Sequence, residues 1–230
     1  MSEQATSLPN QTTVADPAPL GLAGFALTTF VLSVHNANWA PDLVWVGLAL
    51  FYGGLAQFMA GMMEFRNKNT FGATAFCTYG AFWAAFATFI ILDLAHALPA
   101  TLNADNAAGW FLASFAIFNT YMLLASTRLS KAVFGVFFTL ELTLIVLFIG
   151  NFLAGSGHTI GTDLIHVGGY LGVLTAAVAW YASAAGVLNS LTDHALLPVG
   201  APLWRGPSRT LSSSGSSAGA GGYGQAVPQH

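Results

Sequence analysis

The sequence predicts an all-α protein that crosses a membrane six times. Hydrophobic residues fill 55% of its 230 positions and charged residues only 7%, whereas ordinary soluble domains carry about 25% charged residues. A bilayer core about 30 Å thick needs roughly 20 helical residues to cross it, and the uncharged residues fall into six runs of that order. These predicted spans cover residues 20–37, 43–64, 70–95, 108–126, 131–154 and 162–189.

The first span follows a helix start marked by prolines. Pro17 and Pro19 stand in the stretch DPAPLGL (16–22), just before an apolar run. Proline fixes φ near −65° and lacks a backbone N–H, so it suits the first turn of a helix and disrupts the interior. Asp16 supplies a capping oxygen and a negative charge at the positive end of the helix dipole. We expect a sharply defined helix start here, after a disordered tail over residues 1–15.

The second span carries a polar residue on a glycine face. Gly53, Gln57 and Gly61 are spaced by four and share one side of a helix. Glycines let another helix or a solute approach closely, and Gln57 places an uncharged donor and acceptor in that groove. Both a tight helix–helix contact bonded through Gln57 and a polar site in a pore fit this pattern.

The third span contains Tyr79 and the single cysteine of the chain, Cys77. A tyrosine in the middle of a membrane needs a partner for its hydroxyl group, which an ordinary interhelical bond supplies. One cysteine allows no intramolecular disulfide, and its position within the span predicts a buried structural thiol. The fourth span is predicted from its apolar run.

The fifth span holds Glu141, the only acid near the middle of any predicted span. Charge at this depth is expensive, so the side chain faces protein or water, or it is protonated. A polar or proton-carrying site in a pore and a structural hydrogen bond from the neutral acid both fit. In the sixth span Gly168, Gly172 and Ala176 share one face, which predicts close helix packing.

Basic residues predict the orientation of the spans. They fall between spans 2 and 3, between spans 4 and 5, and after span 6, and the loops on the other side have none. The positive-inside rule then places both termini in the cytoplasm and the protein in the cell membrane. The transport domain is expected over residues 16–200, followed by a disordered Gly/Ser-rich tail over 201–230. The basic residues are Arg66, Lys68, Arg128, Lys131, Arg205 and Arg209.

Histidines do not form the facing pairs that a haem or metal enzyme uses within its spans. No HxxxH motif occurs, and four of the six histidines fall at the predicted outer boundary. We therefore predict no enzymatic activity, no cofactor, no metal ligands and no nucleic-acid partner. A metal site at the outer boundary is the alternative. The four histidines are His35, His96, His158 and His166.

Several motifs, taken in order, resemble the acetate uptake transporter family. The family signature NPAPLGL stands here as DPAPLGL, and the other matching stretches follow it along the chain. The resemblance covers roughly residues 16–200. The matching stretches are GFALTTFVLSVHN (24–36), FYGGLAQFMAG (51–61), EF (64–65), NTFGATAF (69–76), YGAFW (79–83), IGN (149–151) and GG (168–169).

The resemblance implies a six-helix protomer that forms hexamers, with a narrow pore in each protomer. It implies transport of acetate and similar short-chain monocarboxylates, and of succinate in some members, as a channel or a proton-coupled carrier. It places a hydrophobic constriction on Phe25, Tyr79 and Leu140. From the spacing, Tyr79 and Leu140 each lie ~14 Å from the cytoplasmic start of their span and Phe25 ~8 Å, at 1.5 Å per residue.

The resemblance also implies a pore entrance at the first helix start. Unpaired N–H groups and the helix dipole attract anions weakly there without a basic residue. Two positions depart from the family: Asp16 replaces the signature Asn, and Glu141 follows the constriction leucine. Adjacent helical side chains differ by about 100°, so Glu141 points either beside the pore or into it. The entrance residues are Asp16, Pro17, Ala18, Pro19, Leu20, Gly21 and Leu22.

Two other functions fit the sequence. A narrow apolar constriction suits another small solute, such as ammonium, water or a polyol, and only the resemblance favours acetate. A membrane sensor that transports nothing is the second alternative. No Lys or Arg lies in the interior of a span, which indicates weak substrate binding through hydroxyls, amides and backbone, as rapid conduction requires.

Overall fold

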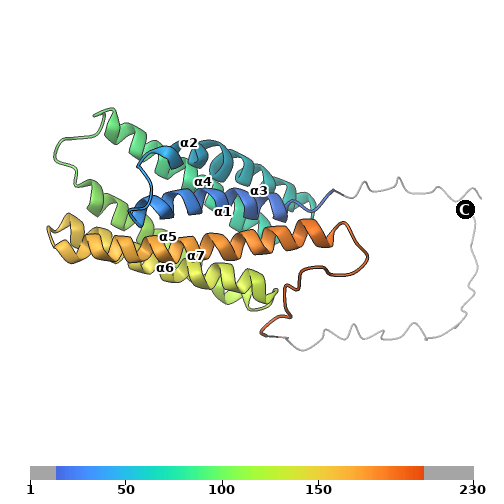
Figure 1. Cartoon of the computed structure of the whole chain (residues 1–230). Coiled ribbons are helices and arrows are strands. Elements are labelled where there is room, and N and C mark those ends of the chain that lie inside the picture. The colour runs from blue at the N-terminus through green and yellow to red at the C-terminus, as the bar shows by residue number, and fades with distance from the viewer. Residues whose placement is uncertain (1–13, 205–230) are drawn as a thin grey trace, which may run out of the picture.

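Helices joined by short loops make up the computed structural model, which describes residues 14–204 (Figure 1). Six helical stretches are long and apolar enough to cross a membrane, so the six predicted spans are confirmed. The largest shift is at the fourth, which begins at residue 104 rather than 108. The helices are α1 (Ala18–Asn36), α2 (Val44–Leu50), η1 (Phe51–Ala56), α3 (Gln57–Arg66), α4 (Thr70–Leu94), α5 (Ala104–Ser126), α6 (Lys131–Gly155) and α7 (Thr159–Asn189).

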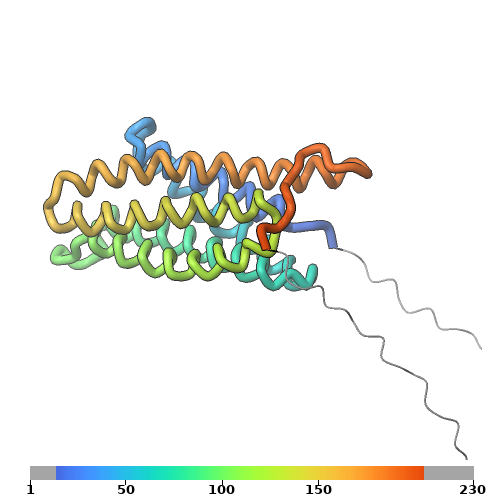
Figure 2. The backbone as a smooth tube through the Cα atoms, turned by 90° about the horizontal axis from the view of Figure 1, so that it is seen from below, coloured from blue at the N-terminus to red at the C-terminus, as the bar shows by residue number. Residues whose placement is uncertain are grey.

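The helices run up and down in one bundle, with the first and last described residues at the same end (Figures 1 and 2). α7 packs against α1 and α6, α5 packs against α6, and α4 packs against the continuous span formed by α2, η1 and α3. We call the end with the described chain ends the proximal end and the opposite end the distal end. The loops after α3 and after α5, which carry the basic residues Arg66, Lys68, Arg128 and Lys131, lie at the proximal end.

The start of α1 agrees with the expectation from the prolines. The N-cap residue is Pro17, so Asp16 stands one position before the cap rather than at it as predicted. The backbone N–H of Ala18 still donates to Asp16 Oδ1 at 3.0 Å, so the acid satisfies one free N–H group of the first turn. The Ser183 hydroxyl of α7 donates to the carbonyl oxygen of Pro19 at 2.7 Å. The beginning of α1 is therefore anchored to the proximal part of α7.

A π-helical turn, η1, interrupts the second span, and sequence analysis did not predict it. The turn lies against α1, where a Cβ atom added to Gly24 would meet the Tyr52 carbonyl oxygen at 2.7 Å. A Cβ added to Gly53 would meet the Thr28 hydroxyl oxygen at 2.6 Å. Glycines on both elements therefore permit a backbone approach that side chains would prevent.

The chain after α7 packs back onto the proximal end. The backbone N–H of Trp204 donates to the Thr127 carbonyl oxygen at 3.0 Å, and the Arg128 guanidinium lies 4.0 Å above the Trp204 ring. Order thus continues past residue 200, where the tail was expected to begin. The rest of the predicted tails, residues 1–13 and 205–230, lies outside the described residues.

Candidate functional site

Three cavities follow one another through the bundle. A proximal cavity of about 290 Å³ is lined by Ala18 and Ser130, next to the starts of α1 and α6. A distal cavity of about 310 Å³ is lined by Asn36 and Asp105, at the opposite ends of the helices. They have no lining residue in common, but a central cavity of about 40 Å³ shares residues with both. A water molecule occupies about 30 Å³ in the liquid, so the path narrows in the middle to about one water.

Phe25, Tyr79 and Leu140 lie at the boundary between the proximal and central cavities and line both. They come from α1, α4 and α6 and are 5%, 4% and 6% exposed. The rings of Phe25 and Tyr79 meet edge to face, with centroids 5.7 Å apart and planes at 61°. The structure therefore brings the three predicted constriction residues together, and we call this place the neck.

Tyr79 is held by aromatic side chains that sequence analysis did not name. Phe82, Phe115, Phe118 and Phe137 surround its ring, with centroid distances of 5.4–6.4 Å. Edge-to-face and tilted pairs of this kind add stability beyond their buried area. This packing fixes the position of the Tyr79 ring, and the Tyr79 hydroxyl group needs a hydrogen-bond partner among the polar side chains nearby.

That partner is Asn119 of α5, which is fully buried. The Tyr79 hydroxyl donates to Asn119 Oδ1 at 2.7 Å, and Asn119 Nδ2 donates to Glu141 Oε2 at 2.7 Å. The interhelical bond expected for Tyr79 is therefore present. Glu141 lies behind Tyr79 and lines none of the three cavities. Asn119 was missed, although an asparagine inside an apolar span is itself a signal for a buried polar contact.

Gln57 also lies outside the three cavities. Its side chain is 1% exposed and Oε1 has no hydrogen-bond partner. Its Cβ lies near Gly24 of α1, so the structure shows a tight helix contact at this face, but Oε1 does not make the expected hydrogen bond across it. Cys77, expected to be buried, is half-buried, and its thiol lies 3.9 Å from the Phe58 carbonyl oxygen.

The entrance motif divides between the cavity and helix packing. Ala18 and Leu22 line the proximal cavity. Gly21 is buried against α4, where an added Cβ would meet the Phe76 ring at 2.7 Å. Leu20 and Asp16 are exposed. Two of the seven motif residues therefore line the proximal cavity.

Glu64 is a residue of the proximal cavity that sequence analysis did not single out. Its side chain is fully buried, and Oε1 has no hydrogen-bond partner. Asn67 Nδ2 donates to Oε2 at 3.4 Å, and Asn69, which caps α4, lines the same cavity. In the sequence Glu64 stands at the end of a span, where an acid is unremarkable; only the packing of α4 against α3 buries it.

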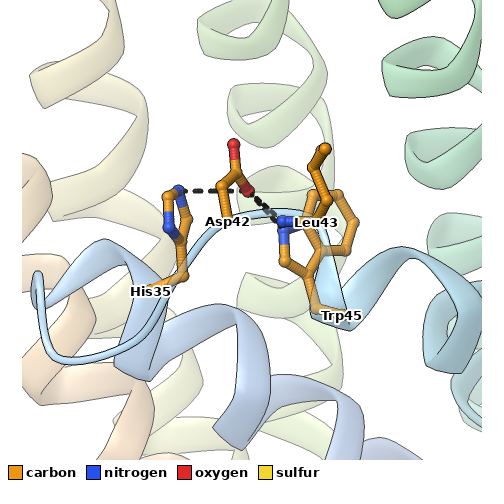
Figure 3. A network of polar contacts seen from close by, with 4 residues as sticks. All are labelled: His35, Asp42, Leu43 and Trp45. Atoms are coloured by element: carbon orange, nitrogen blue, oxygen red, sulfur yellow. Dashed lines mark hydrogen bonds and ion pairs between the residues drawn. The ribbon is translucent and has the colours of Figure 1, made fainter.

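The distal cavity has an acidic mouth. Asp42 Oδ1 accepts from the Leu43 backbone N–H at 2.6 Å and from the Trp45 indole at 3.2 Å, and it lies 3.4 Å from His35 Nε2 (Figure 3). These contacts hold Leu43 at a φ of +71°, a left-handed conformation that is uncommon for a leucine. Asp93 and Asp105 line the same cavity. Within residues 14–204, no group of three or more His, Cys, Asp or Glu side chains is placed to hold a metal ion.

The three cavities and the neck belong to a region that matches one known family. A model of the GPR1/FUN34/yaaH family matches residues 2–201 and so includes all six spans. The chain belongs to the GPR1/FUN34/yaaH family. The motif-based resemblance to an acetate uptake family is thereby confirmed, and so is a multi-pass membrane protein with the helical fold of that family.

Proteins with different names are similar to this chain. It is 42% identical over 192 residues to "Ammonia transport outward protein 2" of Saccharomyces cerevisiae, covering 80% of this chain and 65% of the relative. It is 37% identical over 192 residues to "Succinate-acetate/proton symporter SatP" of Escherichia coli strain K12, covering 82% of this chain and 97% of the relative.

A solved structure shares the fold. The structure of the bacterial acetate channel SatP matches with a TM-score of 0.75 and 34% identity, covering 82% of this chain and 100% of that chain. The Saccharomyces cerevisiae and Emericella nidulans relatives are longer proteins: the chain spans 64–65% of their length.

Proposed function

We propose that this protein carries acetate and similar short-chain monocarboxylates across the cell membrane, through a path within each protomer. The observation that supports this most directly is the neck, where Phe25, Tyr79 and Leu140 separate two cavities from opposite ends of the bundle. Similarity to a succinate–acetate/proton symporter and to an acetate channel supports the choice of substrate. We infer transport rather than catalysis as the activity.

The chemistry of the path favours small solutes that carry at most one negative charge. No Lys or Arg lines any of the three cavities, so a carboxylate meets no permanently charged side chain that would hold it tightly. Weak binding permits rapid exit. A dianion pays a larger desolvation penalty at an apolar neck than a monocarboxylate does, so succinate is expected to pass more slowly than acetate.

The proximal end is assigned to the cytoplasm. Arg66, Lys68, Arg128 and Lys131 all lie in loops or at helix ends there, which supports the assignment by the positive-inside rule. Acetate would then meet the start of α1 and the proximal cavity on the cytoplasmic side. Labelling of single cysteines placed in the loops of intact cells tests the orientation.

The protomers are proposed to assemble as hexamers. The number comes from the family resemblance, and an apolar groove supports a membrane-buried contact. The groove lies along η1 and α4, where Phe51 and Leu55 are 69% and 54% exposed and offer apolar surface to a partner protomer. Native mass spectrometry in detergent measures the number of protomers directly.

Labelled acetate entry into proteoliposomes tests the proposed substrate. Saturable uptake above protein-free liposomes is expected, and Leu140→Ala should change its selectivity. Uptake indistinguishable from empty liposomes would refute the assignment. An inward proton gradient should accelerate acetate uptake by a proton-coupled carrier but not by a passive channel. The leak of neutral acid, measured in protein-free liposomes, is subtracted first.

Ammonium is the second candidate solute. The similarity to an ammonia transport outward protein at 42% identity supports it, and the uncharged neck admits neutral ammonia as readily as acetic acid. Liposomes loaded with a pH-sensitive dye report ammonia entry as internal alkalinisation. If the protein speeds the entry of ammonia but not of acetate, ammonia rather than acetate is its substrate.

A further inference from the structure

A chain of polar side chains runs sideways from the neck to the outer surface of the bundle. It begins at Tyr79 on α4, continues through Asn119 on α5 and Glu141 on α6, and ends at Thr120 on α5. Asn119 is fully buried and Thr120 is exposed. A carboxyl group therefore lies behind the wall of the proposed path, bonded to the residue that holds the Tyr79 hydroxyl.

The hydrogen-bond distances in this chain favour a protonated Glu141. Thr120 Oγ1 lies 2.9 Å from the Ala116 carbonyl oxygen and 2.8 Å from Glu141 Oε1. A hydroxyl group has one hydrogen and an ionised carboxylate has none, so with ionised Glu141 one hydrogen must serve both acceptors. A protonated Glu141 donates from Oε1 to Thr120, whose own hydrogen then goes to Ala116. Every donor and acceptor in the chain is satisfied by the neutral acid.

The surroundings contain no cation to stabilise a carboxylate. Among residues 14–204, the only acidic and basic side chains within 4 Å of each other are Asp42 and His35 at the distal mouth. Lys131, the basic residue of α6, precedes Glu141 by ten positions, about 15 Å along a helix. The titratable groups around the chain are Tyr79 and Tyr121.

The charged groups of α7, which packs against α6, are remote from Glu141. Asp163 and His166 lie in the first two turns of that helix, at the distal end. An unpaired charge within the membrane is expensive, whereas a fully bonded neutral acid is not.

We propose that Glu141 is a neutral carboxylic acid that positions Tyr79 through Asn119. Asn119 Nδ2 donates to both Glu141 Oε2 and the Phe137 carbonyl oxygen, at 2.7 and 2.9 Å. A flipped amide would set its oxygen against those two oxygens, so Asn119 Oδ1 must face Tyr79. The Tyr79 hydroxyl hydrogen is thereby directed away from the neck.

The inference rests on the proposed transport function and limits its mechanism. With its hydrogen engaged by Asn119, Tyr79 offers a permeating anion no donor, only its ring and an oxygen lone pair. The amide of Asn119 is not a proton carrier, and Glu141 touches no cavity. Proton coupling therefore does not run through Glu141, and its role is to fix the shape and polarity of the neck.

Three substitutions and one control test the proposal by the ratio of lactate to acetate uptake. Glu141→Gln keeps an acceptor for Asn119 and a donor for Thr120, so the ratio and the response to a proton gradient should match the wild type. Glu141→Leu should change the ratio about 3- to 10-fold. In a protein that already carries Tyr79→Phe, the further change Glu141→Leu should leave the ratio as it is in Tyr79→Phe alone, because the effects of coupled residues are not additive. Thr139→Val is the control, since that hydroxyl bonds only its own helix.

Three transport results would overturn the proposal. Loss of the gradient response in Glu141→Gln alone would make Glu141 a proton carrier, and an unchanged ratio in Glu141→Leu, or equal effects of that change in both backgrounds, would remove the link to Tyr79.

An infrared measurement tests the protonation state without transport. The wild type minus Glu141→Gln difference spectrum at neutral pH should show the carbonyl band of a protonated carboxylic acid, and a carboxylate band instead would refute the neutral state. The infrared measurement requires no transport, so it tests the protonation state of Glu141 even if the wild-type protein moves no acetate. A wild-type protein that moves no acetate would refute the proposed transport function, and this outcome is distinguishable from a carboxylate band.

Discussion

Leu140→Ala tests whether the neck selects solutes by size. The central cavity holds about 40 Å³, and shortening a leucine to alanine opens on the order of 100 Å³ when the walls do not collapse. Forcing extra atoms into a tight apolar site typically costs about 1–3 kcal/mol. Relief of that strain should speed lactate passage about 5- to 150-fold, while acetate, which already fits, gains less. The ratio of lactate to acetate uptake in proteoliposomes should therefore rise.

Stability is the main confounding effect in this experiment. Leu140 is 6% exposed, and deleting a buried leucine costs about 2–5 kcal/mol. Met122→Ala is the matched control, because Met122 is 4% exposed and lines none of the three cavities. It should lose similar thermal stability and keep the wild-type ratio. A folded Leu140→Ala protein with an unchanged ratio would refute the assignment of the neck to this position.

Three further predictions concern the helix contacts and the proximal cavity. Gly24→Ala should lower the melting temperature in detergent, because the added Cβ would meet the Tyr52 carbonyl oxygen at 2.7 Å. Gly47→Ala is the control and should leave the melting temperature unchanged, since its added Cβ would meet nothing within 4 Å. Equal shifts of the melting temperature in the two variants would contradict the close approach of α1 and η1. Glu64→Gln should weaken the acceleration of acetate uptake by a proton gradient, since Glu64 is the one acid lining the proximal cavity; an unchanged acceleration would exclude it as the coupling group. Replacing Pro17 and Pro19 with alanine should lower uptake more than membrane abundance, both measured on the same vesicles, and a parallel fall would make the prolines purely structural.

Composition and run length were enough to predict the six spans, because a bilayer leaves a backbone few other solutions. The boundaries depended on capping. The fourth span begins at residue 104 because Asn103 Oδ1 accepts the Asn106 backbone N–H at 2.9 Å, which starts the helix in a polar stretch that hydropathy assigns to a loop. The π-helical turn had no sequence signal, since apolar residues and glycines suit α and π turns alike.

The candidate site was predicted unevenly. The grouping of Phe25, Tyr79 and Leu140 came from motif resemblance, and spacing alone indicated only their depth. Asn119 and Glu64 were missed because their importance depends on neighbours from other helices. Gln57 and Glu141 were singled out correctly as unusual polar residues within spans, but helical periodicity does not reveal whether such a residue faces a cavity or another helix.

The sequence by itself determined that the chain spans a membrane six times, that its basic residues share one side, and which motifs identify its family. These properties depend on hydrophobicity, charge and local order along the chain. Only the tertiary structure decided that three cavities follow one another with a neck between the proximal and central ones, that Glu64 lines the proximal cavity, and that Glu141 lies behind the neck, bonded to Asn119. The rotation of each helix about its axis, set by side-chain packing between segments far apart in the sequence, determines which polar groups meet a solute and which meet one another.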